Sequence, residues 1–268
     1  MKTLYVSDLD GTLLRGDEKT SQFTNETINR LVEKGLVFSY ATARSFVTAH
    51  KAAGFTAHFP VILYNGAMMI DNADEKLILK NTFADDILGL LHELISEGVY
   101  PLVYAFKQES EKYSFIYEKC SGDTKAFIAT RNDRRTTSVD TVEELLAGEI
   151  FYISCIGYED RLPVFYERYK DRYRCLLQRD IYTKALWLEI MPKGVTKAAA
   201  VLQLKEKLGC ERVVSFGDGL NDLDMFAVSD ECYAVENAEE KLKAAATAVI
   251  GSNEQDGVAR WLIENCGI

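Results

Sequence analysis

The residues with the clearest chemical potential lie near the N-terminus, in the stretch LYVSDLDGTLL. An apolar run ends there in two carboxylates, Asp8 and Asp10, and a Gly-Thr turn and a second apolar pair follow. The i, i+2 spacing at a strand end allows both side chains to share one face of a sheet. Paired aspartates at a strand end are more often a solvated turn than a site, so a functional interpretation depends on other groups.

Three further groups of polar residues flank predicted elements. They are Thr42, Ala43 and Arg44 at the end of a strand over 36–42, Lys193 and Lys197 at the start of a helix over 196–209, and Asp218, Asn221 and Asp222 at the end of a strand over 212–218. Ligands of a parallel α/β sheet bind at the carboxyl ends of its strands. We therefore expect these groups to meet Asp8 and Asp10 in one crevice.

The elements that must position these groups alternate between short apolar runs and amphipathic stretches. The first five are a strand over 3–7, a helix over 24–35, a strand over 36–42, a helix over 45–54 and a strand over 60–66. This βαβαβ order predicts a parallel sheet with helices on both faces. Thr24 is the predicted N-cap of the first helix, and Phe23 with Ile28 fits a hydrophobic staple.

The alternation breaks after a predicted hairpin over 68–79. A helix over 84–98 is followed by strand-like runs with few helices between them, which indicates an antiparallel or mixed sheet. The polar stretch 121–138 shows no clear element. We predict an α/β fold, with a Rossmann-like core of residues 1–83 and 186–268 and an inserted α+β domain over 84–185.

Composition excludes several classes of partner. The formal net charge is −10 and no Lys/Arg cluster offsets it, so neither a nucleic acid nor a membrane is an expected partner. The six cysteines show no C-x-x-C spacing, and reduced thiols in a cytoplasmic protein are the simplest interpretation. No signal peptide or membrane span is visible, and the three histidines lie in no motif, which argues against metal–imidazole chemistry.

The polar groups resemble the four motifs of the haloacid dehalogenase (HAD) superfamily in order and spacing. The matching segments are DLDGT, the hydroxyl in ATAR, the lysine in PKGVTKAAA and GDGLND. The inserted domain resembles the large α/β cap of the Cof-type sugar-phosphate phosphatases, and VILYNGA, VENA and the late DGVA are similar to that subgroup. The resemblance covers the whole chain and favours Lys197 over Lys193, since the family's lysine matches the TK pair.

Several carboxylates in one crevice repel each other unless a divalent cation lies between them. Mg²⁺ takes oxygen ligands, typically one or two carboxylates, waters and a substrate phosphate oxygen. Asp8 and Asp218 are the best side-chain ligands. The resemblance implies that Asp10 ligates through its backbone carbonyl and that Asp222 orients metal-bound water.

The same residues predict a reaction in two steps. Asp8 is the nucleophile and forms an aspartyl-phosphate. Asp10 protonates the leaving alkoxide and then takes a proton from the attacking water. Mg²⁺ and Lys197 offset the repulsion between a carboxylate and a phosphate.

The remaining phosphate oxygens are expected to contact Thr42, the backbone N–H of Ala43 and Asn221. Arg44 lies at the site edge, with a ligand contact and a salt bridge equally open. Related sequences usually have Gly at the position of Ala43, and Ala restricts the backbone more than Gly does.

These residues predict a Mg²⁺-dependent phosphatase of small phosphorylated metabolites, sugar phosphates in particular. A phosphomutase or other phosphotransferase with the same nucleophile is the first alternative, and a non-catalytic phosphate- or metal-binding regulator is the second. A dinucleotide enzyme is disfavoured because no G-x-G-x-x-G follows the first strand. The sequence makes no prediction of the oligomeric state.

Overall fold

The chain divides into two compact units. The computed structural model describes residues 1–84, 86–108, 110–131, 133–180 and 183–267. The first unit consists of Met1–Lys80 and Thr196–Ile268, and the second of Asn81–Val195. The predicted insertion over 84–185 lies inside the second unit. Strand β11 (Leu186–Met191), which the predicted boundary gave to the core, pairs with β9 (Glu149–Ile156) of the second unit.

The first unit, here called the core unit, is built on a mixed sheet of order β14-β13-β12-β1-β2-β3-β4-β5. Its strands are β1 Thr3–Asp8, β2 Val37–Ala41, β3 Pro60–Leu63, β4 Met68–Asp71, β5 Leu77–Lys80, β12 Arg212–Gly217, β13 Glu231–Val235 and β14 Ala248–Ile250. Neighbouring strands are parallel from β14 to β3, and β4 and β5 are antiparallel additions at one edge. The predicted parallel core and the predicted hairpin are both confirmed.

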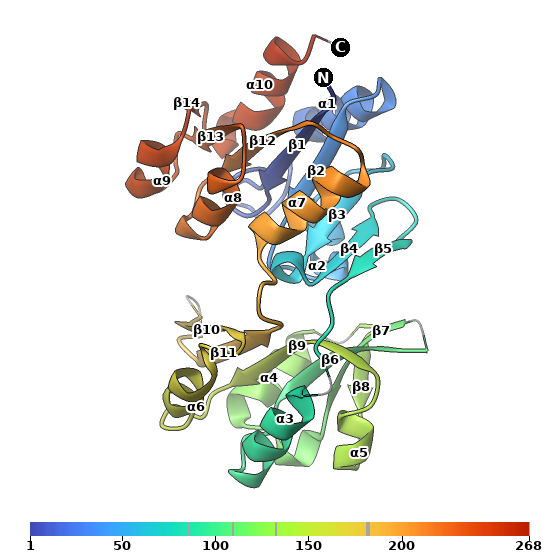
Figure 1. Ribbon diagram of the computed structural model, residues 1–268, viewed down its shortest axis with the longest axis vertical. Helices are drawn as coiled ribbons and strands as arrows, with labels where there is room; N and C mark the ends of the chain where they lie inside the picture. The colour runs from blue at the N-terminus through green and yellow to red at the C-terminus, as the bar shows by residue number, and fades with distance from the viewer. Residues whose placement is uncertain (85, 109, 132, 181–182, 268) are drawn as a thin grey trace. The chain divides into compact units, whose positions relative to one another are not determined.

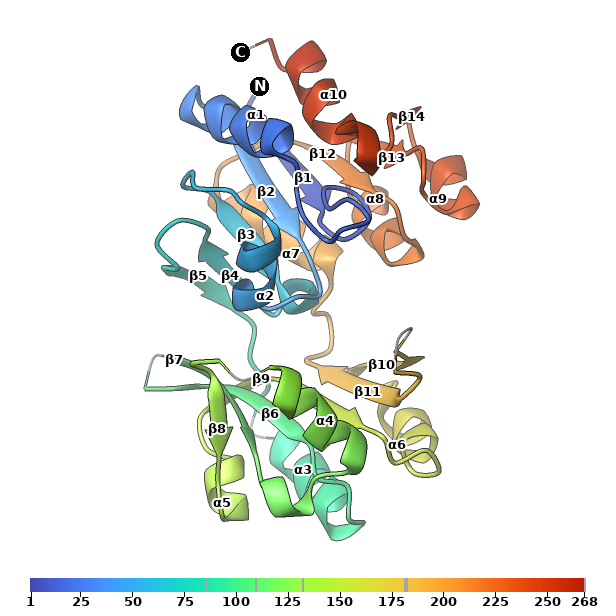
Figure 2. The ribbon, with the colours of Figure 1, turned by 180° about the vertical axis from the view of Figure 1, so that it is seen from behind.

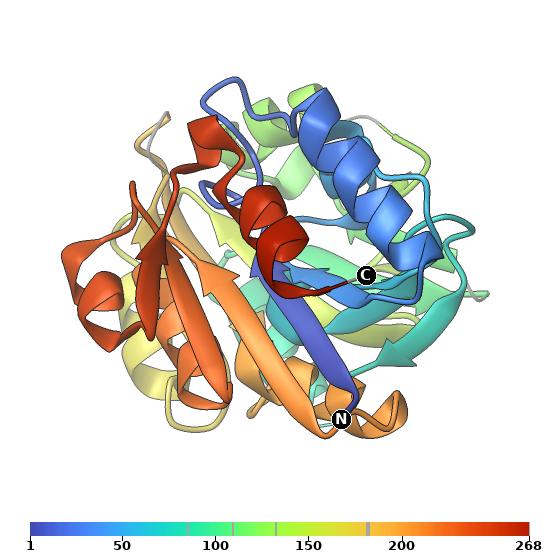
Figure 3. The ribbon, with the colours of Figure 1, turned by 90° about the horizontal axis from the view of Figure 1, so that it is seen from above.

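Helices cover both faces of this sheet. They are α1 Gln22–Glu33, α2 Phe46–Ala52, α7 Lys197–Lys207, α8 Leu223–Ala227, α9 Glu240–Ala245 and α10 Gly257–Asn265. Helices α1 and α10 lie side by side on one face, and α7 and α8 lie on the other (Figures 1, 2 and 3). The apolar face of α7 carries Ala200, Val201 and Leu204 into a buried cluster with Leu4 and Val6 of β1. The central strand β1 is thereby enclosed on both sides.

The start of α1 differs from the prediction. Ser21 is the N-cap: its backbone is extended, and its hydroxyl accepts a hydrogen bond from the N–H of Thr24 at 2.9 Å. Thr24 is thus inside the helix. Phe23 lies in the first turn rather than before the cap, is 38% exposed, and packs beneath the Arg260 guanidinium, so the predicted staple with Ile28 is wrong.

The third strand is shorter than predicted. It ends at Leu63, and Tyr64–Gly66 forms a 3-10 turn in which Tyr64 and Asn65 both have left-handed backbones. An apolar run followed by Asn-Gly therefore ends in a bent segment that lies beside the site described below.

The second unit, here called the cap unit, is a six-stranded sheet of order β10-β11-β9-β6-β7-β8. Its other strands are β6 Leu102–Lys107, β7 Ser110–Phe115, β8 Thr136–Ser138, β9 Glu149–Ile156 and β10 Arg174–Arg179, and its helices are α3 Ile87–Ser96, α4 Gly122–Thr130, α5 Val142–Leu145 and α6 Leu162–Tyr169. Its pairs are antiparallel except β7–β8, as expected for a mixed sheet. Leucines of α3, Leu145 of α5 and Phe165 of α6 share one apolar cluster with the sheet.

Helix α4 and strand β8 lie in the stretch 121–138, for which the sequence predicted no element. Ser121 caps α4 by accepting from the N–H of Thr124 at 3.0 Å. Only Thr124 and Ile128 of this helix are buried. The helix therefore lacks the wide apolar stripe on which a periodicity argument depends.

Candidate active site at the carboxyl ends of the core strands

The centre of the site is a buried ion-pair cluster at the end of β1. Asp8 is 3% exposed and Lys197, the first residue of α7, is also 3% exposed. The Lys197 ammonium donates to Asp8 Oδ1 and, at 2.8 Å, to Asp222 Oδ1. Asp222 is fully buried, and its Oδ2 accepts the backbone N–H groups of Asp218 and Gly219. One cation thus joins two carboxylates from different strand ends.

The electrostatics of this cluster are unbalanced. Burial and the nearby Asp222 carboxylate raise the pKa of Asp8 well above its usual range, although Lys197 opposes them. Burial would lower the pKa of Lys197, but Asp8 and Asp222 outweigh it and raise the pKa. Burial and Asp222 also raise the pKa of Asp218 to about 6. The carboxylates of Asp8, Asp218 and Asp222 therefore outnumber the one ammonium group, that of Lys197, in this cluster.

The donor set fits a hard divalent cation. Asp8, Asp218 and Asp222 each offer a carboxylate oxygen, and these oxygens lie within 4.8 Å of one another. Asp8 Oδ2 is buried and has no hydrogen-bond partner among the described residues. A buried, unpaired carboxylate oxygen is costly, and an oxygen-seeking cation would satisfy it.

Asp10 lies in a different environment two residues further on. Its side chain is 48% exposed. Arg44 donates two hydrogen bonds to its Oδ1, from Nε at 2.8 Å and from Nη2 at 2.6 Å. The Thr42 hydroxyl donates to its Oδ2 at 3.3 Å. Arg44 Nη2 also reaches Glu18 at 3.1 Å. In this structure, therefore, Arg44 forms salt bridges at the site edge and holds the Asp10 carboxylate.

The turn Tyr64–Gly66 shapes the second strand end. The N–H of Asn65 donates to the carbonyl of Thr42 at 2.9 Å, and that of Tyr64 to the carbonyl of Arg44 at 3.2 Å. Gly66 has a φ of +107°, and a Cβ there would lie 2.5 Å from the carbonyl oxygen of Thr196, the N-cap of α7. This close approach joins the segment that holds Asp10 to the helix that holds Lys197.

Gly11 allows the chain to bend away from the site directly after Asp10. Its φ is +77°, which favours glycine, and a Cβ at this position would lie 2.2 Å from Asp218 Oδ2. Thr12 then donates its hydroxyl to Asp218 Oδ1 at 3.2 Å. Gly11 therefore makes room for the Asp218 carboxyl group, and Thr12 binds it.

The other predicted residues are distributed as follows. Ala43 and Asn221 are exposed, in the turns that follow β2 and β12. Lys193 belongs to the cap unit, where its ammonium donates to the carbonyl of Asp171 at 2.9 Å. Sequence reasoning gave no role to Thr12 or Glu18. The position of Thr12 inside the DGT motif was a usable signal, whereas nothing local marks Glu18.

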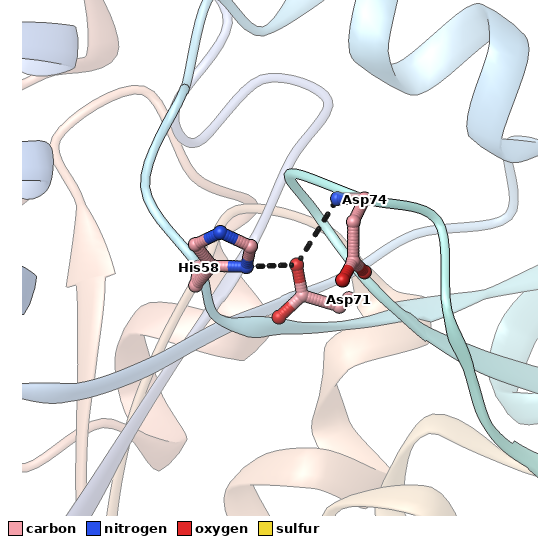
Figure 4. Close-up of side chains that lie close together, drawn as sticks. All are labelled: His58, Asp71 and Asp74. Atoms are coloured by element: carbon pink, nitrogen blue, oxygen red, sulfur yellow. Dashed lines mark hydrogen bonds and ion pairs between the residues drawn. The ribbon is translucent and has the colours of Figure 1, made fainter.

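A second group of metal-type side chains lies at the β4–β5 hairpin (Figure 4). His58 Nδ1 contacts Asp71 Oδ1 at 2.9 Å, and that oxygen also accepts the N–H groups of Ala73 and Asp74. His58 is 70% exposed. These contacts are those of a hairpin turn with a surface ion pair, and they are complete without an ion.

Two whole-chain findings bear on the expected environment. All six cysteine thiols are free. Within the described ranges, no helix has the length and apolar character needed to cross a lipid bilayer.

The family model of the haloacid dehalogenase-like hydrolases matches residues 5–262, and the chain belongs to this family. The resemblance drawn from the four motifs is thus confirmed.

Relatives over the whole length place the chain more closely. A Bacillus subtilis 5-amino-6-(5-phospho-D-ribitylamino)uracil phosphatase is 26% identical over 269 residues, 97% of this chain and 96% of that protein. A solved structure from Thermotoga maritima matches with a TM-score of 0.80 at 27% identity, covering 98% of this chain and 97% of that one. With the family match, these relatives identify the chain as an enzyme, a phosphatase.

A further solved structure, described as a sugar phosphatase of HAD subclass IIB, has a TM-score of 0.67 at 22% identity. The match covers both chains completely and shows a shared fold.

Proposed function

We propose that this enzyme is a divalent-metal-dependent phosphatase of small phosphorylated metabolites, in particular sugar phosphates, and that it works through an aspartyl-phosphate on Asp8. The observation that carries the proposal is the contrast between two neighbouring carboxylates. Asp8 is buried, with one oxygen paired to Lys197 and the other without a hydrogen-bond partner in the described part of the chain, whereas Asp10 is half exposed and bound by Arg44. Asp8 therefore keeps an oxygen that is able to attack phosphorus, and Asp10 is accessible for proton exchange with a leaving group and with water.

Asp8, Asp218 and Asp222 would hold the cation, Mg²⁺ in our proposal, together with the backbone carbonyl of Asp10. When bound, it supplies positive charge that reduces repulsion between the carboxylates and the phosphate. Lys197 supplies a second positive charge from the protein itself, fixed by its two ion pairs.

In the first step, an oxygen of Asp8 attacks phosphorus, and the bond from phosphorus to the ester oxygen breaks. Asp10 gives its proton to the departing alkoxide, which leaves as an alcohol. Arg44 holds the Asp10 carboxyl group for this transfer.

In the second step, water attacks the phosphoryl group on Asp8 while Asp10 accepts its proton. The bond between phosphorus and the Asp8 oxygen breaks, and inorganic phosphate leaves. Both aspartates then return to their starting states. The Thr42 hydroxyl, the N–H of Ala43 and the Asn221 amide are proposed to bind the phosphate oxygens that do not react.

The cap unit is proposed to select the substrate and to exclude water while the aspartyl-phosphate exists. The sugar preference of the proposal draws on the name of the structural relative as a sugar phosphatase. The phosphate site itself belongs to the core unit.

The test is inorganic phosphate release from a panel of sugar phosphates, with Mg²⁺ and with chelator. Asp8→Asn and Asp10→Asn are expected to abolish Mg²⁺-dependent release without unfolding the protein. Asp224→Asn is the matched control: it removes an exposed carboxylate of α8, two residues from Asp222, and should leave release unchanged. Normal turnover by Asp8→Asn would remove Asp8 as the nucleophile, and transfer of phosphate between sugars without net release would favour a phosphotransferase.

A further inference from the structure

The loop that follows Asp10 is a small folded unit. It runs from Gly11, three residues after the end of β1, to Ser21, the N-cap of α1, and its middle forms a turn over residues 15–19. In this turn the N–H of Arg15 donates to the carbonyl of Lys19 and that of Glu18 to the carbonyl of Arg15, both at 2.9 Å. Glu18 has a left-handed backbone, with φ of +58°. The position of Glu18 therefore follows the position of Arg15.

Side chains from the C-terminal part of the chain hold this loop by its backbone. Asn237 Nδ2 donates to the carbonyl of Gly11 at 2.8 Å, and Asn253 Nδ2 donates to the carbonyl of Leu14 at 2.8 Å. The N–H of Asn253 donates to Asn237 Oδ1 at 3.0 Å, so the two amide anchors are linked. Asn237 lies in the VENA segment, which takes no part in the proposed reaction.

The turn has two further anchors next to α10. Glu254 Oε1 accepts the N–H of Gly16 at 2.6 Å, and Asp256 Oδ2 pairs with Arg15 Nη2 at 2.7 Å. Asp256 is 8% exposed, and its Oδ1 accepts the hydroxyls of Ser21 and Thr24. A buried carboxylate with these bonds to the loop and to the first turn of α1 fixes their mutual position.

The anchors form a clasp of four residues, which are Asn237, Asn253, Glu254 and Asp256. We propose that this C-terminal clasp positions the catalytic acid. The contacts are continuous: Asp256 binds Arg15, the turn places Glu18, and Glu18 binds the guanidinium of Arg44 that grips Asp10. This proposal rests on the proposed role of Asp10 as acid and base.

A role in positioning predicts a particular kinetic signature. A sugar alkoxide is a poor leaving group and needs a proton from Asp10, whereas 4-nitrophenolate leaves without one. Loss of the clasp should therefore slow ester cleavage of sugar phosphates and spare the first turnover of 4-nitrophenyl phosphate. A general structural defect would slow both substrates alike.

The experiment compares the wild type with Asp256→Asn, which tolerates the left-handed backbone of this position but loses the charge that binds Arg15. For the sugar phosphate that turns over fastest, we expect kcat to fall roughly tenfold or more, within the roughly 10²–10⁴-fold that a general acid contributes. KM should stay unchanged within about twofold, since the phosphate ligands are not altered. The initial burst of 4-nitrophenolate should remain.

Glu18→Gln provides a second variant that does not disturb the interior, because the Glu18 side chain is 60% exposed, and it should show the same signature. Glu231→Gln is the matched control. It removes an ion pair with Arg212 in the same unit, at the opposite end of the strands, and should change neither substrate.

Equal losses on both substrates in Asp256→Asn and Glu18→Gln, or no loss in either, would overturn the positioning role. Amide hydrogen exchange of residues 11–19 separates this outcome from a failure of the proposed function, because it needs no substrate. Exchange should rise in Asp256→Asn and not in Glu231→Gln, and unchanged exchange would refute the clasp even in an active phosphatase.

Discussion

Replacing Lys197 by methionine should remove catalysis and destabilise the core unit at the same time. The ammonium of Lys197 lies between Asp8 and Asp222, and the three side chains are 3%, 5% and 0% exposed. Methionine keeps the unbranched shape but brings no charge. Two buried carboxylates would then face each other without a cation.

The expected cost is about 3–5 kcal/mol of unfolding free energy at pH 8 without metal, as for other buried pairs that lose one partner. The cost should be smaller at pH 5. Burial already raises the pKa of Asp8, and loss of Lys197 raises it further, so Asp8 takes up a proton as the pH falls and the repulsion ends. Added Mg²⁺ should recover part of the stability by placing a new cation among the carboxylates.

The two tryptophans make the measurement specific. Trp187 lies in the cap unit, and Trp261 of α10 packs against Phe216 and Tyr233 in the core unit. In a Trp187→Phe background, fluorescence during urea unfolding reports the core unit alone. Lys207→Met is the matched control, since Lys207 is an exposed lysine of the same helix α7 in the same unit.

A second substitution provides the decisive result. Adding Asp222→Asn to Lys197→Met removes one of the two facing charges, so the double variant should be more stable than Lys197→Met alone while it stays inactive. If Lys197→Met costs less than about 1 kcal/mol, or if Asp222→Asn lowers stability further, the cation is not what balances the buried carboxylates.

Three further substitutions test the geometry. Gly11→Ala should abolish phosphate release, because the added Cβ would lie 2.2 Å from Asp218 Oδ2. Gly35→Ala is the matched control: the φ of Gly35 is +100°, and beyond its chain neighbours no described atom lies within 4 Å of the added Cβ, so it should cost only about 1–2 kcal/mol in thermal unfolding and keep activity. Asp218→Asn should stabilise the metal-free protein at pH 8: a pKa raised from 3.8 to about 6 corresponds to roughly 3 kcal/mol, which solvent reduces to about 1–2 kcal/mol. That gain must vanish in urea unfolding below pH 3.8, where the carboxyl group is protonated in both states, and a gain that persists there would contradict it. Burial raises the pKa of Asp256, but hydrogen bonds from Ser21 and from Arg15 outweigh burial and lower the pKa below its usual value. The stability lost in Asp256→Asn should therefore be complete at pH 7 and should disappear as the pH falls through that lowered pKa. An equal loss of stability at all pH values would contradict this sign.

The α/β class, the parallel core and the polar residues at its strand ends could be predicted from the amino-acid sequence alone. Apolar runs ending in Asp8, Thr42 and Asp218 sufficed for this, because the carboxyl ends of parallel strands lie on one edge whatever the details of the loops. The same rule predicted that Lys197, at the start of a helix, lies at that edge of the sheet, and Lys197 is the first residue of α7 and contacts Asp8 there. Helix α4 was not predicted, because a helix with few buried residues has no periodic pattern of apolar residues in its sequence.

The partners of these residues depend on the packing of the folded chain. The salt bridge of Arg44 to Asp10, the carbonyl contact of Lys193 and the clasp of Asp256 on Arg15 each depend on which loops lie side by side after the sheet has formed. Such contacts join positions far apart in the chain and leave no local pattern in either segment. Local propensity and periodicity describe strands and helices, whereas the ionic contacts that hold Asp10 and Arg15 are set by packing between those elements.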